Sequence, residues 1–467
     1  MTRKLFATLQ VAALLVGRPA LTQAGDTAFV DVNVVPMDSE QVLPHQTVVL
    51  RDGLIAQVGP VTEQKVEAGT KVIKGGGKLY LMPGLADLHT HVETAADLLL
   101  YVAHGVTTVL NMGEAPNGIV QVRRKQTETG ETLGPHCYVA FLIDGSGKYG
   151  HFFVIAPEEA RAAVRLAKTN GYDFIKVYNA LSPEAFFALV DEARVQHLAV
   201  VGHGVESVGL EKQLSAGQVM VAHGEEFLYT TFRHQVPLGL GDGGASSSTG
   251  LDEAQIPAAV SFVKKSGAYV IPNLSAFVGI ARQWGKPAEV VRLLEDAETG
   301  NLRPELIRHW ADSSYAKRPG SLDREVVFLR KFTKALSDAG VPLITGTDSP
   351  TIPGLFPGKS EHADIEELVT AGLTRFEALS AASRIPGEFI HQFVAGAPKS
   401  GTVTSGSRAD LLLLRDNPFK TSKALNQIEG VMIGGRWYAK QLLSQRLAAQ
   451  KQVFEKAHHL MRQAQMR

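Results

Sequence analysis

Pro83-Gly-Leu-Ala-Asp-Leu-His-Thr-His91 is an apolar segment that ends in two histidines, two residues apart. Side chains along a β-strand alternate between its two faces, so His89 and His91 point to the same side. A bare His-x-His pair proves little in a chain with 15 histidines. Its position at the end of an apolar strand is informative, because barrel enzymes carry their catalytic groups at the C-terminal ends of their strands.

The chain around this segment alternates between strand-like and helix-like patterns, which favours a parallel sheet. Helical patterns lie between most of the apolar stretches, for example at 157–169 and 183–196. The expected strands are 81–91, 106–111, 137–142, 174–178, 198–203, 219–223, 268–272 and 342–348. Eight such units between residues 83 and 396 predict an α/β fold of the (β/α)8 TIM-barrel type.

The two ends of the chain have a different character. Residues 25–82 and 397–440 show short strands separated by turns such as Arg51-Asp-Gly53, a pattern typical of hairpins. We expect both ends to combine into one small β-sandwich domain. Residues 441–467 are predicted to form a polar, peripheral helical tail, and the long loop at 229–255 is a candidate lid.

Composition excludes several classes of function. Lys plus Arg and Asp plus Glu both number 47, so no basic excess draws the chain to nucleic acid or to an anionic membrane. A single cysteine, Cys137, excludes an intrachain disulfide and a thiolate zinc cluster. We therefore expect a small-molecule substrate as the partner, and homo-oligomerisation stays open.

The N-terminus has the layout of a secretory signal. Arg3 and Lys4 precede an apolar stretch at 5–17, and Ala24 ends a segment of small residues. The pattern predicts cleavage after Ala24 and a secreted or periplasmic protein without a stable membrane anchor. A short buried helix is the alternative interpretation. No later segment reaches the 18 apolar residues that a membrane span needs.

Four further strands end in, or contain, a residue able to bind metal. Lys176 lies in the apolar segment 174–178, where a buried ammonium is costly unless it is paired. It could form a salt bridge, a Schiff base, or a carbamate with CO2 that bridges two cations. His203, His223 and Asp348 each close a predicted strand. Because all of them fall at strand ends, we favour the carbamate.

This set resembles the binuclear, carboxylated-lysine branch of the amidohydrolase superfamily, from about Ala28 to Tyr438. Segments 174–178, 223–229 and 353–358 are similar to bacterial Xaa-Pro dipeptidases and imidazolonepropionase-like proteins. The resemblance implies that His89, His91 and Asp348 hold one divalent ion. It further implies that His203 and His223 hold a second ion and that carboxylated Lys176 bridges the two.

Such a site predicts hydrolysis of an amide by metal-activated hydroxide, with Asp348 as the proton-transferring group. Histidine and oxygen ligands suit Zn2+ best, while Mn2+ or Co2+ are feasible. The expected substrate is a dipeptide or an N-acyl amino acid, contacted by Tyr229 and His151.

Other readings stay open. Cyclic-amide, lactone or carbamate hydrolysis would use the same two ions. A deaminase of the same superfamily commonly uses one metal and a glutamate near a strand-end histidine, which His223-Gly-Glu225 superficially offers. A non-catalytic barrel would be expected to have lost some of its ligands, and none is missing here.

Overall fold

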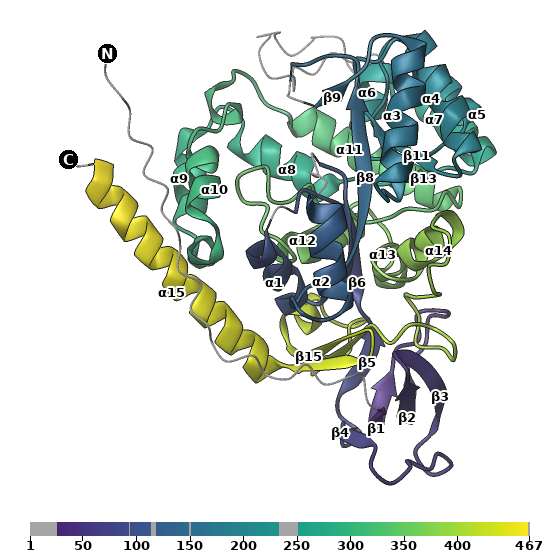
Figure 1. Cartoon of the computed structure of the whole chain (residues 1–467), viewed down its shortest axis with the longest axis vertical. Helices are drawn as coiled ribbons and strands as arrows, with labels where there is room; N and C mark the ends of the chain where they lie inside the picture. Colours follow the sequence, from purple (N-terminus) through teal and green to yellow (C-terminus); the bar gives the residue numbers. More distant parts are fainter. Residues whose placement is uncertain (1–25, 93, 114–117, 149–150, 233–250, 466–467) are drawn as a thin grey trace.

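The computed structural model describes residues 26–92, 94–113, 118–148, 151–232 and 251–465 (Figure 1). The predicted secretory signal at 1–24 lies outside the described residues, as does most of the candidate lid (233–250). In the described part of the chain, no helix is long and apolar enough to cross a membrane.

A curled parallel sheet, here called the parallel sheet, forms the centre of the molecule. Its strands follow the order β13-β12-β11-β10-β8-β7-β6, and β9 pairs with β8 beside this path. The strands are β6 (Leu85–Thr90), β7 (Val106–Asn111), β8 (His136–Asp144), β9 (Phe152–Phe153), β10 (Phe174–Val177), β11 (Ala199–Gly202), β12 (Gln218–Val221) and β13 (Tyr269–Val270). Every strand pair in this sheet is parallel, as the alternating sequence pattern predicts.

The prediction of a regular eighth strand at 342–348 is wrong. Two isolated bridges, Val270 to Leu343 and Thr90 to Ser349, and a few backbone hydrogen bonds, such as Asp348 to His89, join residues 342–349 to β13 and β6 without forming a regular strand. The reason is local. The amides of Gly346 and Thr347 donate to buried carboxylates instead of to a neighbouring strand.

Helices cover the outside of the parallel sheet (Figure 1). In α3 (Pro157–Thr169), Ala160, Ala163, Val164 and Ala167 are buried, which is the 3.6-residue spacing of an amphipathic helix. The others are α1 (Ala95–Ala103), α2 (Arg124–Glu128), α4 (Pro183–Val195), α5 (Leu210–Ala216), α6 (Glu226–Thr230), α7 (Ile256–Ser266), α8 (Leu274–Gln283), α9 (Pro287–Leu294), α10 (Pro304–Ala311), α11 (Asp323–Asp338), α12 (Lys359–Thr370), α13 (Arg375–Ala381) and α14 (Arg384–Phe393).

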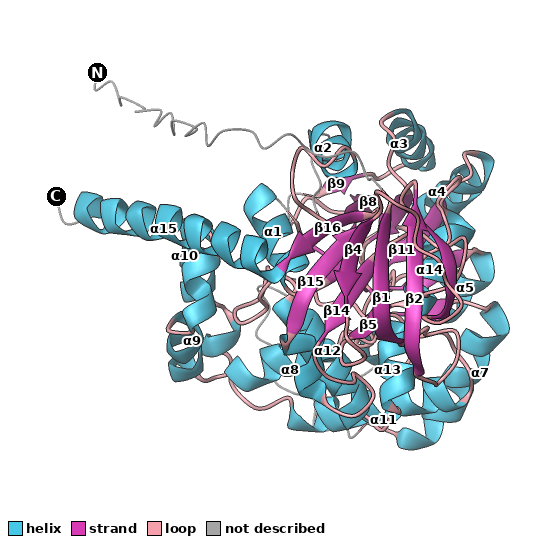
Figure 2. Ribbon diagram, turned by 90° about the horizontal axis from the view of Figure 1, so that it is seen from below, coloured by secondary structure: helices cyan, strands magenta, loops and turns pink. Residues whose placement is uncertain are grey.

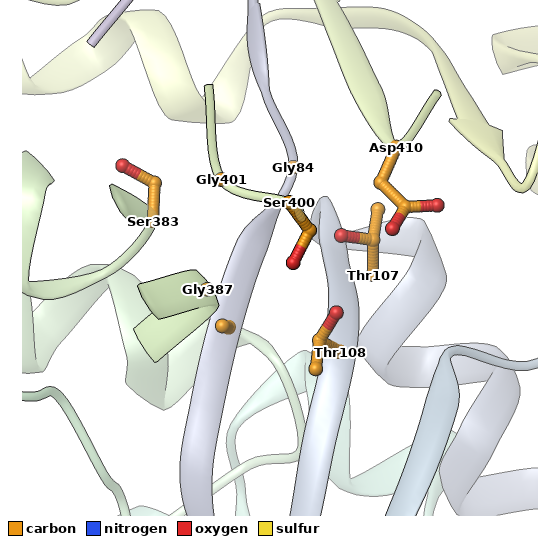
Figure 3. Close-up of a pocket in the computed structure, with 9 residues that line it drawn as sticks. Gly84, Thr107, Thr108, Ser383, Gly387, Ser400, Gly401 and Asp410 are labelled. Atoms are coloured by element: carbon orange, nitrogen blue, oxygen red, sulfur yellow. The ribbon is translucent and has the colours of Figure 1, made fainter. Parts of the chain in front are cut away.

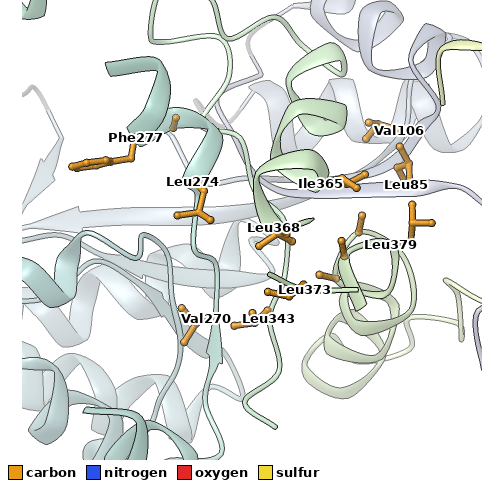
Figure 4. Packing of buried hydrophobic residues seen from close by; sticks show 14 of the residues in the cluster. Leu85, Val106, Val270, Leu274, Phe277, Leu343, Ile365, Leu368, Leu373 and Leu379 are labelled. Carbon is orange, nitrogen blue, oxygen red and sulfur yellow. The ribbon is translucent and has the colours of Figure 1, made fainter. Parts of the chain in front are cut away.

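The largest hydrophobic core lies between these helices and the sheet. Leu85 and Val106 from β6 and β7 meet Ile365 and Leu368 of α12 there, and Leu379 of α13 completes this part (Figure 4). All five side chains are buried. The packing fixes the strands whose far ends carry the candidate site.

Both chain ends build a second sheet, here called the terminal sheet. Its order is β16-β15-β14-β5-β1-β2-β3, with β4 paired to β1. The strands are β1 (Thr27–Val34), β2 (Leu43–Arg51), β3 (Leu54–Pro60), β4 (Lys71–Lys74), β5 (Tyr80–Pro83), β14 (Leu411–Leu414), β15 (Ile428–Ile433) and β16 (Arg436–Ala439). These strands hydrogen-bond as one continuous sheet around a core of their own, where a two-sheet sandwich was expected.

Strand β14 joins the two cores. Leu411 and Leu413 pack into the core of the terminal sheet, whereas Leu412 and Leu414 belong to the largest core. Alternation along a strand sends neighbouring side chains to opposite faces, so a run of four leucines is buried on both sides. The terminal sheet is therefore packed firmly against the rest of the molecule.

Gly84 separates the two sheets. The segment 81–91, expected to be one strand, is divided here into β5 of the terminal sheet and β6 of the parallel sheet. A Cβ at Gly84 would lie 2.1 Å from Oγ1 of Thr107, so only glycine fits. Beside it lies a small cavity, with room for about one water molecule, that Thr107, Thr108 and Asp410 also line (Figure 3). The cavity is at the N-terminal ends of β6 and β7, away from the candidate site.

The C-terminal helix α15 (Lys440–Gln465) follows directly from β16 and extends beyond the body of the molecule (Figure 2). Leu443 is buried in the largest core, and the Gln450 side chain donates to the carbonyls of Ala96 and Asn301. A helical tail at 441–467 was expected, and a helix is found over 440–465.

Candidate active site

The residues singled out in the sequence meet at the C-terminal ends of the parallel strands. His89 and Lys176 lie within β6 and β10, while His203 comes directly after β11. His223 follows β12 by two residues, and Asp348 comes from the irregular segment in the eighth position. Side chains far apart in the sequence thus share one edge of the sheet.

His89, His91 and Asp348 form one compact group. Oδ1 of Asp348 lies 2.7 Å from Nε2 of His91 and 3.4 Å from Nε2 of His89. One ligand atom from each of the three residues falls within 4.8 Å of the others, so a single metal ion could contact all three. A Cβ at Gly113 would lie 2.2 Å from Nδ1 of His91, so a glycine there leaves room for that ring.

Lys176 and His223 lie next to His89, and His203 lies next to His223. Nζ of Lys176 is 3.2 Å from Nε2 of His89. The His223 ring centroid is 4.3 Å from that of His89 and 4.5 Å from that of His203. Lys176 is 1% exposed, so its ammonium is enclosed beside these imidazoles. Carboxylation of the amine would replace this buried cation with an anion.

Three of the histidines use Nδ1 to bond outwards. Nδ1 of His89 donates to the carbonyl of Ala222 at 3.1 Å, and Nδ1 of His203 donates to Oε1 of Glu226 at 2.6 Å. Nδ1 of His223 lies 3.1 Å from the side-chain amide of Asn273. In this orientation the side-chain nitrogen of Asn273 faces the ring, and the side-chain oxygen has no partner among the described residues. Exchanging the two atoms lets Nδ1 donate to the oxygen. In each ring, Nε2 is then the nitrogen left for a metal.

The electrostatics of the site favour neutral imidazoles and an ionised carboxylate. Burial lowers the pKa of His89 and His203 well below the usual value, and Lys176 adds to both shifts. Burial and then His203 lower the pKa of His223 to about 3. Burial opposes ionisation of Asp348, but His91 outweighs it and the pKa falls to about 2. These are the protonation states that metal ligands need.

A buried aspartate that the sequence analysis missed joins the two chain segments of the His-His-Asp group. Asp87 accepts hydrogen bonds from the amide of His89 at 3.2 Å, and from the amide and hydroxyl of Thr347 at 3.0 and 2.6 Å. Asp348, the residue after Thr347, has φ +61°, a backbone conformation that residues other than glycine rarely adopt. Asp87 therefore holds both ligand-bearing segments in place. Its charge within an apolar strand was the signal in the sequence.

Glu226 and Asn273 were also missed. Glu226 accepts from His203, from the amide of Gly204 and from the side chain of Asn179. Glu226 lies in segment 223–229, which carried the family resemblance but gave Glu226 no role, and Asn273 follows β13 outside any motif. The position of Glu226 three residues after His223 is a weak signal at best.

The two residues expected to contact the substrate, His151 and Tyr229, have different surroundings. The Tyr178 ring contacts both His151 and His203, with its centroid 4.6 and 4.1 Å from theirs, so His151 lies next to a side chain that touches the site. Nδ1 of His151 is 3.7 Å from Oδ2 of Asp144. Tyr229 is within α6, and its hydroxyl is buried.

Solved structures share this fold along most of the chain. A putative prolidase from Bifidobacterium longum has a TM-score of 0.66 at 21% identity, covering 91% of this chain and 100% of that one. A bottromycin amidohydrolase gives 0.69 at 22%, covering 91% and 90%. A Xaa-Pro dipeptidase with bound methionine gives 0.63 at 19%, covering 89% and 100%. At these identities, the likeness shows the fold alone.

Sequence comparisons point the same way. A family model described as "Amidohydrolase family" matches residues 80–438. An adenine deaminase from Paracoccus denitrificans (strain Pd 1222) is 35% identical over 82 residues, which are 16% of this chain and 14% of that protein. An imidazolonepropionase from Shewanella frigidimarina (strain NCIMB 400) is 37% identical over 79 residues, 15% of this chain and 19% of the relative. The aligned parts thus cover only a small share of either relative.

Proposed function

This chain belongs to the amidohydrolase family, and from that premise we propose that it hydrolyses a carbon–nitrogen bond of a small molecule with the help of two divalent metal ions. His89, His91 and Asp348 would hold one ion. His203 and His223 would hold the other, with Lys176, carboxylated by CO2, as the bridge. Zn2+ suits this histidine and oxygen donor set best.

One observation carries the proposal: the Nδ1 atoms of His89, His203 and His223 all face outer partners. Such hydrogen bonds orient metal-binding histidines, because they leave Nε2 free for the ion. Divalent ions bound there supply Lewis acidity for a carbonyl and lower the pKa of water. The hydrogen bonds of 342–349 to both β13 and β6 support an eight-position barrel as the scaffold.

The chain's own residues then move the proton. Asp348 is ionised and lies at the site, so it can accept a proton from the attacking water and donate it to the leaving nitrogen. We propose a dipeptide or an N-acyl amino acid as the substrate. Solved structures named as a prolidase and a dipeptidase, with the same fold, support this choice.

The test combines metal analysis with a hydrolysis screen of dipeptides, N-acyl amino acids, lactones and cyclic imides. The wild-type protein should hold close to two ions per chain and cleave an amide. Lys176→Ala should lose most of the metal and nearly all activity, with partial recovery in formate or bicarbonate, because a small anion can replace the bridge. The exposed Lys168→Ala is the matched control and should behave as wild type.

Two bound ions and full turnover in Lys176→Ala would contradict the bridging role. A lactone cleaved faster than every amide would change the proposed substrate class from amides to lactones, and the proposed metal site would still stand.

A deaminase is the second candidate, since similar sequences include adenine deaminases. In addition, Glu225 lies next to the strand-end His223, with its Oε1 3.4 Å from Nδ1 of the ring. Release of ammonia from adenine, together with one ion per chain, would favour this alternative over amide hydrolysis.

A further inference from the structure

Strand β9 places two exposed phenylalanines beside the C-terminal end of β8. Phe152 is 46% exposed and Phe153 is 53% exposed. Phe152 pairs with Ile143 of β8, and Phe153 pairs with Asp144. Side chains alternate along a strand, and partners in a parallel pair share a face, so the two rings lie on opposite faces of the sheet.

Phe152 lies on the outer face. Its ring packs against that of Phe141, with the centroids 5.2 Å apart. Phe141 and Ile143 contribute to the core that the buried residues of α3 and α4 build. Phe152 therefore faces the helices that cover the parallel sheet.

Phe153 lies on the opposite face, which is also the face of the proposed metal bridge. Lys176 of β10 pairs with Leu142 of β8, so these two side chains point the same way. Asp144 follows Leu142 by two residues and shares its face, and Phe153 is the partner of Asp144. We call this side of the sheet, which carries Lys176, the inner face.

Tyr178 and Phe153 flank β8 at the same height. The carbonyl of Ile143 accepts from the amide of Tyr178, and the carbonyl of Asp144 accepts from the amide of Val154. Successive carbonyls of a strand point to opposite neighbours, so Tyr178, Asp144 and Phe153 form one row across the sheet. Neighbouring strands lie about 4.8 Å apart, so the backbone of Phe153 is about 10 Å from that of Tyr178.

Tyr178 continues this row to the metal site, because its ring centroid is 4.1 Å from that of His203, a proposed metal ligand. We propose that Phe153 binds a large apolar side chain of the substrate, such as that of phenylalanine or leucine. An apolar group that covers the exposed ring removes both surfaces from water, which favours such a substrate. This inference rests on the proposed amide hydrolysis and adds which kind of side chain the substrate carries.

The experiment measures kcat/KM of the holoenzyme on pairs of dipeptides that differ in one residue, phenylalanine or alanine, with each position varied in turn. The wild type should prefer phenylalanine at one position by about 10-fold or more, because even one methylene in an apolar site is worth about that much. Phe153→Ala should remove most of this preference, and Phe153→Leu should keep most of it. Phe152→Ala is the matched control, with the same residue type and similar exposure on the opposite face, and should keep the wild-type preference.

Metal content is measured in every variant and should stay at the wild-type value. A preference that Phe153→Ala leaves unchanged overturns the inference. An equal loss of preference in Phe152→Ala also overturns it, because the inner face would then have no special role. Lost metal together with equal losses on both dipeptides overturns it as well, since Phe153 would then support the metal site.

Failure of the proposed function looks different. A wild type that cleaves phenylalanine and alanine dipeptides equally well keeps amide hydrolysis and refutes the Phe153 contact. A metal-loaded wild type that cleaves no amide refutes the hydrolysis, and calorimetric titration with L-phenylalanine and L-alanine then decides on the contact. The wild type should bind L-phenylalanine about 10-fold more tightly, and Phe153→Ala should remove that difference; equal binding of both amino acids by the wild type overturns the contact.

Discussion

Three histidines of the site, His89, His203 and His223, each have one nitrogen that bonds to the protein and one left for chemistry. That division depends on single atoms, such as the carbonyl of Ala222 and Oε1 of Glu226, both at hydrogen-bonding distance. The choice of nitrogen sets which lone pair faces the site. Changes to single side chains should therefore separate metal binding from proton transfer.

Asp348→Asn should lower kcat by about 10²–10⁴-fold, because the amide cannot accept the proton that general base catalysis requires. Steady-state kinetics on the best amide substrate, with metal content measured in the same sample, checks this. The surface variant Asp338→Asn on α11 is the control. A kcat close to wild type with full metal would assign the proton to another group.

Glu226→Gln should weaken metal binding by about 10–100-fold, since a partner that fixes a ligating histidine is lost. The carboxylate accepts from three donors at once, and an amide offers only one oxygen. Titration with a competing chelator measures the affinity. Unchanged affinity would show that His203 is held by packing alone.

The sequence predicted the proposed metal ligands but not the residues that hold them in place. His89, His91, Lys176, His203, His223 and Asp348 stood out because each follows or lies in an apolar strand, and the structure brings them together. Asp87, Glu226 and Asn273 did not stand out. Their partners are up to 260 residues away, as between Asp87 and Thr347, and local patterns carry no information on such contacts.

At the scale of elements, regular periodicity was the reliable guide. The predicted helix at 157–169 is found with the same bounds as α3, because proline begins it and small apolar residues recur along one face. The apolar pattern at 342–348 misled, since buried carboxylates from β6 and α12 accept from two of its amides, those of Gly346 and Thr347. The break at Gly84 was missed because it depends on Thr107 across the junction.

Leu412→Ala tests how β14 holds the terminal sheet to the rest. Leu412 is fully buried in the largest core, and its side chain lies close to Gly105, the residue before β7. Truncation should lower the free energy of unfolding by about 2–5 kcal/mol, because it removes buried methyl groups and leaves a cavity. Urea unfolding measures it. The half-exposed Leu442→Ala on α15 should change the free energy by less than about 0.5 kcal/mol.

Across the whole molecule, α12 connects α1 to the segment just before β15. Nε2 of His362 donates to the carbonyl of His104 at 2.8 Å, and its Nδ1 lies 3.3 Å from the side-chain oxygen of Asn426. His362 is buried at this junction, so its ionisation affects parts of the chain that are distant in sequence. Acid should therefore weaken the fold as a whole.

Burial, with His104 adding to it, lowers the pKa of His362 from 6.5 to about 4. The unfolded chain binds this proton below pH 6.5 and the folded chain does not, so stability is present at neutral pH and is lost as the pH falls from about 6.5 to about 4. His362→Gln should reduce that loss by about 3 kcal/mol. Urea unfolding across this pH range, with the exposed His309→Gln as control, measures the slope; an unchanged slope would contradict the assignment.

The pairing of β5 with β14 also has a consequence in time. Pro83 of β5 faces Leu411 of β14, and the difference between these positions, 411 − 83, is 328 residues. At about 5–20 residues per second, a ribosome needs roughly 15–65 s to make that stretch. Throughout this interval the nascent chain carries a hydrophobic strand edge without its neighbour, which is the kind of surface that aggregates or recruits chaperones. Synthesis that stops before residue 411 would leave that edge open permanently.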